Sequence, residues 1–279
     1  MTATLMDGQT LARTLLDETA ERAATFTRTH GRRPCLATVL VGDDPASHTY
    51  VRMKVNRCAA VGIESRRVDL PAATSTDELV ALLRQLSADR TVDGILLQHP
   101  VPGHIDERAA FEAIAADKDV DGVTGASFAA TAFGERGFVS CTPGGIMRLL
   151  DAYDVPLRGR RAVVVGRSAI LGKPVGMLLL ARDATVTYCH SRTVDLAAHV
   201  AEADVVVAAA GVPELVRGEW IKPGAVVVDA GYNPGNVGDV EFAAAADRAG
   251  LITPVPGGVG PMTIATLLAQ TVDAAELHG

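Results

Sequence analysis

Tyr50 and Lys54 are the first residues along the chain whose types and spacing suggest chemistry. They stand four positions apart in a segment that predicts a helix from about His48 to Val61, so their side chains share one helix face and can act on one ligand. Phenols and amines are among the side chains that transfer protons in enzymes. The same spacing is typical of a solvated helix edge, so the pair by itself leaves both interpretations open.

Gln98 closes a predicted strand, Gly94–Gln98, and stands at its carboxyl end, where open α/β sheets bind ligands. The Pro-rich segment HPVPG follows it, and an amide that only satisfies a turn is the alternative. Asp119 and Asp121 in DKDVDG form a candidate carboxylate pair, although turns also use short acidic side chains to bond their own backbone. Only one of the two need be functional.

A nucleotide site is predicted in the run GRSAILG, from Gly166 to Gly172, which follows a very apolar strand and opens a helix. A tight turn and bare amide groups there can receive a dinucleotide pyrophosphate. Ser168 replaces the middle glycine of the GxGxxG pattern and the last glycine comes one residue late, so an ordinary turn between strand and helix is the alternative.

The type of dinucleotide is suggested by the end of the next strand, which runs into His190, Ser191 and Arg192. An NAD enzyme normally has a carboxylate there to hold the ribose hydroxyls. Arg192, with Arg167 in the first turn, could instead meet the extra phosphate of NADP, or both could be ordinary solvated arginines. The missing carboxylate and the two cations favour NADP over NAD.

The segment PGGVGP combines rigid and bare backbone, and it contains Pro256, Gly257, Gly258 and Val259. Such a segment suits either close approach to a ring or a hinge between domains. The seven histidines form no Ser-His-Asp or metal constellation by spacing, so we expect no metal and no nucleophilic hydrolase chemistry.

These candidates are positioned by two predicted α/β units, in which apolar strands alternate with amphipathic helices, as in parallel sheets covered by helices. No confident periodicity runs from Val123 to Ser140, so a loop is predicted there. A last helix, from about Met262 to His278, could return to the first unit. Further strands are predicted at residues 35–41, 63–70, 162–165, 185–189, 203–210 and 225–230.

Composition excludes several classes of protein. A chain of 279 residues with 48% hydrophobic residues can build real cores, and its net charge of −7 without a long basic run argues against nucleic-acid or acidic-membrane partners. Four cysteines stand far apart, which indicates buried, reduced thiols of a cytoplasmic protein rather than a disulfide framework or zinc site. Neither a signal peptide nor a membrane span is predicted.

The motifs occur together in an order that resembles the methylenetetrahydrofolate dehydrogenase/cyclohydrolase family of the bifunctional FolD type. The chain contains, in sequence, DDPASHTYVRMK, GILLQHPVP, DKDVDG, CTPGGI, VVVGRSAILGKP, TYCHSRT, EWIKPGAVVVDAG and ITPVPGGVGPMT. The resemblance covers nearly the whole chain, and the blocks are far more specific together than singly.

The resemblance implies that Lys54 is the central catalytic residue, that Tyr50 positions the folate, and that Gln98 bonds near Lys54 to tune its charge and orientation. Asp121 would hold the pterin. A hydride would pass from the methylene carbon to the nicotinamide, and water would then attack the methenyl cation to give formyltetrahydrofolate. In a partly desolvated site the proton affinity of Lys54 could fall enough for proton relay at neutral pH.

The resemblance also implies an α/β folate domain (residues 1–140 with 262–279), a Rossmann-like NADP domain with a parallel sheet (141–261), a cleft between them, and a homodimer. Cofactor-contacting positions would then be Gly166, Arg167, Ser168, Ser191 and Tyr232, while Pro256 to Val259 would line the folate side.

The sequence departs from the family pattern at His99, in the 123–133 segment and at Tyr232. His99 and that segment adjoin the proposed pterin site, so an enzyme with dehydrogenase activity only, or one that uses another pterin carrier, is an alternative. A non-catalytic NADP-binding regulatory protein is a third reading, which the joint presence of Tyr50, Lys54, Gln98 and Asp121 weakens.

Overall fold

The computed structural model describes the backbone of residues 2–42 and 45–279, and the side chains of residues 2–42 and 53–279. The chain divides into two compact units, each built from three stretches of sequence. Unit 1 contains residues 1–13, 131–135 and 140–266, and unit 2 contains residues 14–130, 136–139 and 267–279. Helices α1 (Gly8–His30) and α10 (Val259–His278) each begin in unit 1 and end in unit 2.

Unit 2 has a parallel sheet in the order β3-β2-β4, with β2 in the centre. Its strands are β2 (Cys35–Val41), β3 (Glu64–Leu70) and β4 (Gly94–Leu97). Every residue of β2 is buried, because a central parallel strand is covered on both faces, and this explains its unbroken apolar run. The accompanying helices are α2 (Pro45–Ala60), α3 (Thr76–Ala88) and α4 (Glu107–Phe111), of which α2 packs on β2 and β3.

Helix α3 shows how local sequence sets an element's start. The Ser75 side chain accepts a hydrogen bond from the Glu78 backbone N–H, and the Glu78 carboxylate accepts one from the Ser75 N–H, so a capping box fixes the first turn. Leu79, Leu83 and Leu86 then recur at helical spacing and are buried.

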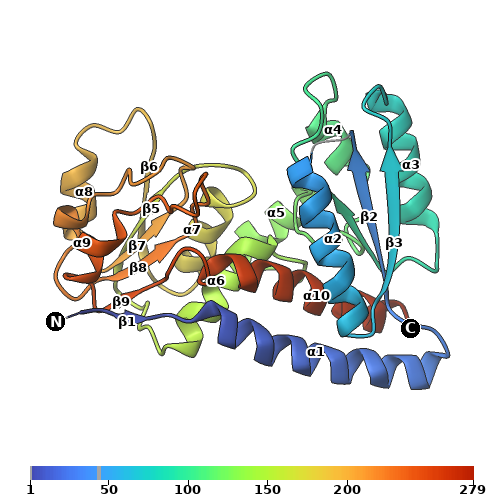
Figure 1. Cartoon of the computed structure of the whole chain (residues 1–279), viewed down its shortest axis with the longest axis horizontal. Helices are drawn as coiled ribbons and strands as arrows, with labels where there is room; N and C mark the ends of the chain where they lie inside the picture. Colours follow the sequence, from blue (N-terminus) through green and yellow to red (C-terminus); the bar gives the residue numbers. More distant parts are fainter. Residues whose placement is uncertain (1, 43–44) are drawn as a thin grey trace. The chain divides into compact units, whose positions relative to one another are not determined.

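Unit 1 has a parallel sheet of six strands in the order β1-β9-β8-β7-β5-β6. Its strands are β1 (Thr4–Leu5), β5 (Arg161–Val165), β6 (Thr185–Cys189), β7 (Val205–Ala208), β8 (Val226–Asp229) and β9 (Leu251–Ile252). Its helices are α6 (Cys141–Ala152), α7 (Gly172–Leu180), α8 (Leu196–Glu202) and α9 (Phe242–Ala246), with a short 3-10 helix η1 (Gly218–Trp220). Figure 1 shows α7 on one side of this sheet and α8 and α9 on the other.

Alternate residues of the central strands build the core on the side of α8 and α9. Val163, Val165 and Val206 belong to one buried cluster with Val200 of α8 and Ala245 of α9. Strand β6 pairs with one edge of β5 and β7 with the other, so the chain reverses its direction of travel through the sheet at β5. In doubly wound sheets, ligands bind at the carboxyl ends of the strands at such a reversal.

The predicted loop between Val123 and Ser140 is wrong, because α5 (Gly125–Phe133) lies within it. The sequence GASFAATAF is too rich in small residues to show a clear apolar stripe. A start signal was nevertheless present, since the Thr124 hydroxyl accepts a hydrogen bond from the Ser127 N–H at 3.1 Å, as a helix-capping threonine does. Strands β1 and β9 were also missed, because each is two residues long and so shows no periodicity.

Within the described residues, no helix is long and apolar enough to cross a membrane. The four cysteines are all free and buried. The same described part of the chain has no group of three or more His, Cys, Asp or Glu side chains arranged to hold a metal ion.

Candidate functional site

Lys54 and Gln98 are in direct contact in unit 2. The Lys54 Nζ donates a hydrogen bond to the Gln98 Oε1 at 3.0 Å, and the Gln98 Nε2 donates to the carbonyl of His99 at 2.8 Å. Because the amide nitrogen has its own acceptor, the amide oxygen must face Lys54. This hydrogen bond positions the Lys54 ammonium, and the Lys54 side chain is half-buried.

The topology of unit 2 explains why these two residues meet. Lys54 lies on α2, which follows β2, and Gln98 follows β4 directly. Strand β4 pairs with one edge of β2 and β3 with the other, so the carboxyl ends of β2 and β4 flank the sheet's reversal point. Tyr50 also belongs to α2, but its side chain lies outside the described residues.

The carboxylate pair of the DKDVDG turn divides into one structural and one available group. Asp119 is fully buried and accepts hydrogen bonds from the backbone N–H groups of Val123 and Thr124 and from the hydroxyl of Ser127. Burial raises the pKa of Asp119, while these donors oppose the rise. Asp121 is half-exposed and, within the described part of the chain, has no hydrogen bond or ion pair. A ligand can therefore reach only Asp121.

His99 has a packing role in unit 2. Its ring lies edge-on to Phe111 with centroids 6.1 Å apart. Aromatic pairs favour this geometry, so the His99 ring packs against Phe111.

The turn from Gly166 to Gly172 is too tight for side chains at either end. Gly166 has φ of +138°, and a Cβ there would lie 2.1 Å from the Ala209 carbonyl oxygen. A Cβ on Gly172 would lie 2.5 Å from the Gly166 carbonyl oxygen. The Ser168 hydroxyl accepts hydrogen bonds from the N–H groups of Leu171 and Gly172 at 3.2 Å each, so serine closes this turn where the usual pattern has glycine.

The loop after β6 is also closed by its own hydrogen bonds. The Thr193 hydroxyl accepts from the His190 N–H at 2.8 Å, and the His190 Nδ1 accepts from the Arg192 N–H at 3.2 Å. The side chains of Ser191 and Arg192 are exposed, as is that of Arg167 in the preceding turn. None of these three side chains has a partner among the described residues.

The remaining predicted site residues also lie in unit 1. Tyr232 follows β8 and is 62% exposed, and its hydroxyl contacts the Asn236 Oδ1 at 3.2 Å. Gly258 is buried in the segment before α10, and Val259 is the first residue of that helix. Pro256 and Gly257 precede them, with Gly257 at φ of +108°. Lys54 belongs to unit 2 and is therefore not among the residues that unit 1 brings together.

Sequence reasoning did not single out two buried carboxylates in unit 1, Asp229 and Asp239. Asp229 ends β8 and accepts hydrogen bonds from the backbone N–H groups of Gly231, Asp239 and Val240. Burial, and secondarily the nearby Asp239 charge, raise the pKa of Asp229 to about 6 against these donors. The sequence held one signal for Asp229, an acidic residue at the end of the very apolar strand VVVD.

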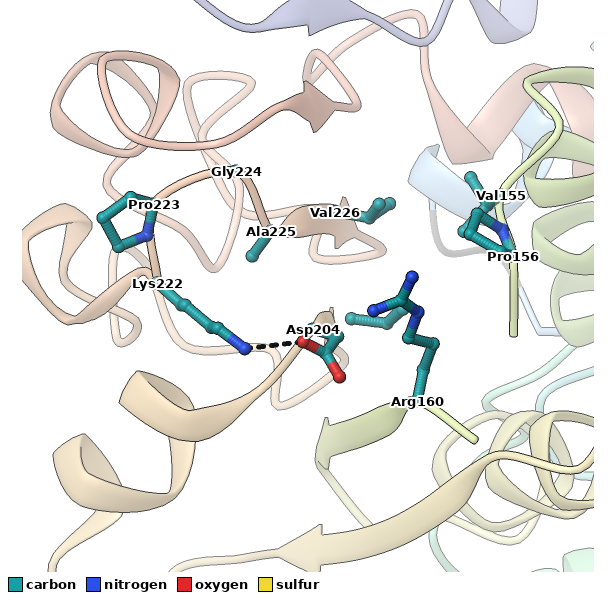
Figure 2. A pocket seen from close by; sticks show the side chains of 10 residues that line it. Val155, Pro156, Arg160, Asp204, Lys222, Pro223, Gly224, Ala225 and Val226 are labelled. Carbon is teal, nitrogen blue, oxygen red and sulfur yellow. Dashed lines mark hydrogen bonds and ion pairs between the residues drawn. The ribbon is translucent and has the colours of Figure 1, made fainter. Parts of the chain in front are cut away.

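A cavity of about 200 Å³ lies at the opposite edge of the same sheet, at the amino ends of β5, β7 and β8. Figure 2 shows the Lys222 ammonium pointing to Asp204, and both residues line the cavity. The two groups form an ion pair at 2.6 Å. Arg160, Pro156 and Pro223 are among the other residues that line it. The cavity contains none of the predicted site residues.

Unit 1 has the architecture of a dinucleotide-binding α/β domain: a doubly wound parallel sheet with a glycine-constrained turn at its reversal point. Unit 2 adds a smaller parallel sheet with a lysine–glutamine pair at the corresponding edge. The fold and site therefore define a class of protein: an α/β enzyme of two units that uses a dinucleotide.

Comparison with protein families names that class. The catalytic-domain model of tetrahydrofolate dehydrogenase/cyclohydrolase matches residues 6–121, and the NAD(P)-binding-domain model matches residues 140–279. The chain belongs to the tetrahydrofolate dehydrogenase/cyclohydrolase family. The predicted family, the α/β fold and the prediction of an enzyme with dehydrogenase and cyclohydrolase activity are confirmed.

Individual relatives agree over the full length. The chain is 80% identical to bifunctional protein FolD 1 of Salinispora arenicola, with 100% of both chains covered. It is 42% identical to the bifunctional FolD crystal structure from Campylobacter jejuni, with a TM-score of 0.96 and 99% of each chain covered. The Trypanosoma brucei dehydrogenase-cyclohydrolase, complexed with NADP cofactor and inhibitor, is 40% identical with a TM-score of 0.95, covering 99% of this chain and 98% of that one.

Proposed function

We propose that this enzyme oxidises 5,10-methylenetetrahydrofolate with NADP to 5,10-methenyltetrahydrofolate and hydrolyses that product to 10-formyltetrahydrofolate. The observation that carries the proposal is the hydrogen bond between the Lys54 Nζ and the Gln98 Oε1 at the carboxyl edge of the unit 2 sheet. It supplies a positioned amine where sheets of this kind bind ligands.

The first reaction transfers a hydride from the methylene carbon and leaves a methenyl cation. NADP, when bound, supplies the nicotinamide that accepts the hydride. The protein's task in this step is to hold the folate so that this carbon can meet the nicotinamide in a fixed orientation. We assign Tyr50 and Lys54 to that positioning in unit 2.

The second reaction adds water to the methenyl carbon, opens the ring and releases one proton. The neutral Lys54 amine accepts one proton from the attacking water and returns it to the ring nitrogen as that nitrogen leaves. The second proton of the water passes to solvent when the new hydroxyl becomes the formyl carbonyl, and this is the proton released. A lysine amine keeps N–H groups in both protonation states, so Gln98 can hold it throughout this cycle. Gln98 therefore acts as a positioning residue.

Asp121 is proposed to bind the pterin ring. A carboxylate can accept two parallel hydrogen bonds from an amino group and an adjacent ring N–H, which is the donor pair that the pterin's pyrimidine edge presents. Support comes from its half-exposed side chain, which lacks a partner in the described structure, whereas Asp119 is occupied.

The dinucleotide is proposed to lie against the carboxyl edge of the unit 1 sheet. Gly166 and Gly172 keep the turn tight, because a Cβ at either position would meet a backbone carbonyl oxygen. A tight turn at the start of a helix suits a pyrophosphate, and Ser168 can donate its hydroxyl proton. Ser191 and Arg192 follow β6, where a ribose phosphate rather than free hydroxyls would be held.

Arg167 adds a second cation for that phosphate, and Tyr232 offers an exposed ring to the cofactor. The NADP bound to the Trypanosoma brucei relative also favours NADP over NAD.

Several further assignments belong to this proposal. Unit 2 would be the folate unit and unit 1 the NADP unit, with Pro256, Gly257, Gly258 and Val259 on the folate side of the latter. The enzyme would work as a homodimer in the cytoplasm, in keeping with four free thiols. We expect no nucleic-acid or membrane partner.

The test follows reduced cofactor and methenyl product together by absorbance, with NADP and with NAD. We expect NADP reduction with little methenyl accumulation beyond the spontaneous hydrolysis blank. Accumulating methenyl would leave a dehydrogenase alone, and no reduction with either cofactor would refute the proposal. In Lys54→Met we expect hydrolysis of added methenyltetrahydrofolate to fall to the blank, and an unchanged rate would show that Lys54 is not the proton carrier.

A further inference from the structure

Asp239 is a fully buried carboxylate that lies outside the regular elements of unit 1. Its Oδ2 accepts hydrogen bonds from the backbone N–H groups of Ala210 and Gly211 at 2.6 and 2.7 Å, and its Oδ1 accepts one from the Asn233 Nδ2 at 3.0 Å. Those donors come from two different loops, one after β7 and one after β8. One side chain therefore joins two loops at the carboxyl edge of the sheet.

The loop after β7 bears directly on the glycine turn. Ala209 precedes the two N–H donors. Its carbonyl oxygen would lie only 2.1 Å from a Cβ at Gly166. The Ala209 N–H is bonded to the carbonyl of Val165 at the end of β5. Any shift of Ala210 and Gly211 would therefore move the surface against which the turn after β5 rests.

The loop after β8 carries Tyr232, whose neighbour Asn233 is the side-chain donor to Asp239. Asp229 secures the far end of this loop, since it accepts hydrogen bonds from the N–H groups of Asp239 and Val240 at 2.9 Å each. The two carboxylates thus form a single buried assembly, with Asp229 fixing the backbone that presents Asp239.

We propose that Asp239 is a positioning residue for dinucleotide binding: it holds the loops after β7 and β8 in the arrangement that the cofactor requires. This inference rests on the proposed placement of the dinucleotide at Gly166 and Tyr232. Asp239 acts through backbone N–H groups and Asn233, so it sets cofactor affinity and takes no part in the chemistry of Lys54.

The test is Asp239→Asn in the full-length enzyme. An asparagine oxygen can face Ala210 and Gly211 only if its NH₂ faces the Asn233 amide. Either that contact is then lost, or the Asn233 amide turns and loses its hydrogen bond to the Val237 carbonyl. We expect KM for NADP to rise about tenfold or more with kcat for oxidation changed far less, as follows when a buried donor loses its acceptor. Cyclohydrolase activity on added methenyltetrahydrofolate, which needs no NADP, should stay within about twofold of wild type.

Asn233→Ala provides a milder second variant, because it removes one anchor and leaves the carboxylate in place. It should raise KM for NADP by a smaller factor, which keeps the proposal testable if Asp239→Asn does not fold. The matched control is Asp204→Asn, which removes a carboxylate before the same strand, β7, at the opposite edge (Figure 2). This control should leave KM for NADP unchanged.

Equal losses of both activities in Asp239→Asn, or an unchanged KM for NADP in both loop variants, would overturn the inference and leave Asp239 with a structural role only. Failure of the proposed function is a separate result, because it would show as absent NADP reduction in the wild-type enzyme.

Discussion

At the scale of single residues, chemical type proves less informative than what each polar atom already binds. Asp119 and Asp121 stand two positions apart, and only the buried one has its oxygens occupied by the protein. In the same way the Gln98 amide donates from its nitrogen to the His99 carbonyl, so its oxygen faces Lys54. Partners in space therefore divide the candidate residues into supporting groups and groups available to a ligand.

This division predicts opposite phenotypes for two similar substitutions. Asp121→Asn should raise KM for the folate substrate about tenfold with little change in thermal stability, because it removes one charged acceptor from the ligand. Asp119→Asn should lower the free energy of unfolding by about 1–3 kcal/mol, because one amide oxygen cannot serve three donors. Steady-state kinetics and thermal denaturation of both variants measure the contrast, and equal effects in the two assays would contradict it.

Asp229 predicts a pH dependence of stability. Its folded pKa, about 6, lies above the ordinary value of 3.8, so the folded state holds the proton more tightly than the unfolded state. Its contribution is fully present below pH 3.8 and is lost as the pH rises through about 6. The stability deficit of Asp229→Asn relative to wild type should accordingly be largest near the acidic end of this window and shrink toward neutral pH.

Urea denaturation of both proteins at several pH values across that window provides the measurement. The difference between the two proteins is the informative quantity, since all other titrating groups are shared. A deficit that grows as the pH rises would reverse the expected sign and refute the assignment.

At the scale of elements, the turn between β5 and α7 is tightly constrained by backbone contacts. Gly172→Ala should displace the Gly166 carbonyl, since the added Cβ would lie 2.5 Å from its oxygen. We expect loss of most NADP affinity, by about tenfold or more, with cyclohydrolase activity retained. Gly159→Ala is a suitable control in the same unit, because its Cβ would meet no atom within 4 Å and only its φ of +73° carries a conformational cost.

NADP binding followed by fluorescence titration separates the two glycine variants. Equal affinity losses would show that general destabilisation, rather than the shape of the turn, controls binding.

The sequence predicted most elements because their apolar runs are long or their caps are explicit. The strands predicted at residues 185–189 and 35–41 are observed with those bounds as β6 and β2. Helix α5 was missed because its small residues hide the periodicity, and β1 and β9 because two residues cannot show one. Candidate site residues were found by type and spacing, but the division between Asp119 and Asp121 and the anchors of Asp239 depend on folded contacts.

At the scale of the whole molecule, neither unit is a continuous stretch of sequence. Unit 2 includes the second part of α10, where the Gln270 Nε2 donates to the carbonyls of Val120 and Val139 at 2.7 and 3.0 Å. Arg22 of α1 forms ion pairs with Asp273 and Glu276 of the same helix segment. The end of α10 thus completes the unit that contains Lys54.

A chain shortened to residues 1–266 should therefore lose cyclohydrolase activity, because the backbone beside Asp121 loses the Gln270 donor and much buried surface. NADP binding should be retained more fully, since residues 140–266 of unit 1 remain. Parallel assays of methenyltetrahydrofolate hydrolysis and NADP binding test this expectation, and full hydrolytic activity in the shortened chain would contradict it.

The same interleaving sets an order of events during synthesis. Residues 14–130 and 136–139 are synthesised well before residues 267–279, yet all three stretches belong to unit 2. Strand β1 likewise has only β9 to pair with in its sheet, and β9 is translated about 250 residues later at roughly 5–20 residues per second. Unit 2 therefore cannot complete its fold, and keeps part of its apolar surface exposed, until nearly the whole chain has been synthesised. A chaperone that shields this half-finished chain should thus matter more for its yield than for the stability of the finished enzyme.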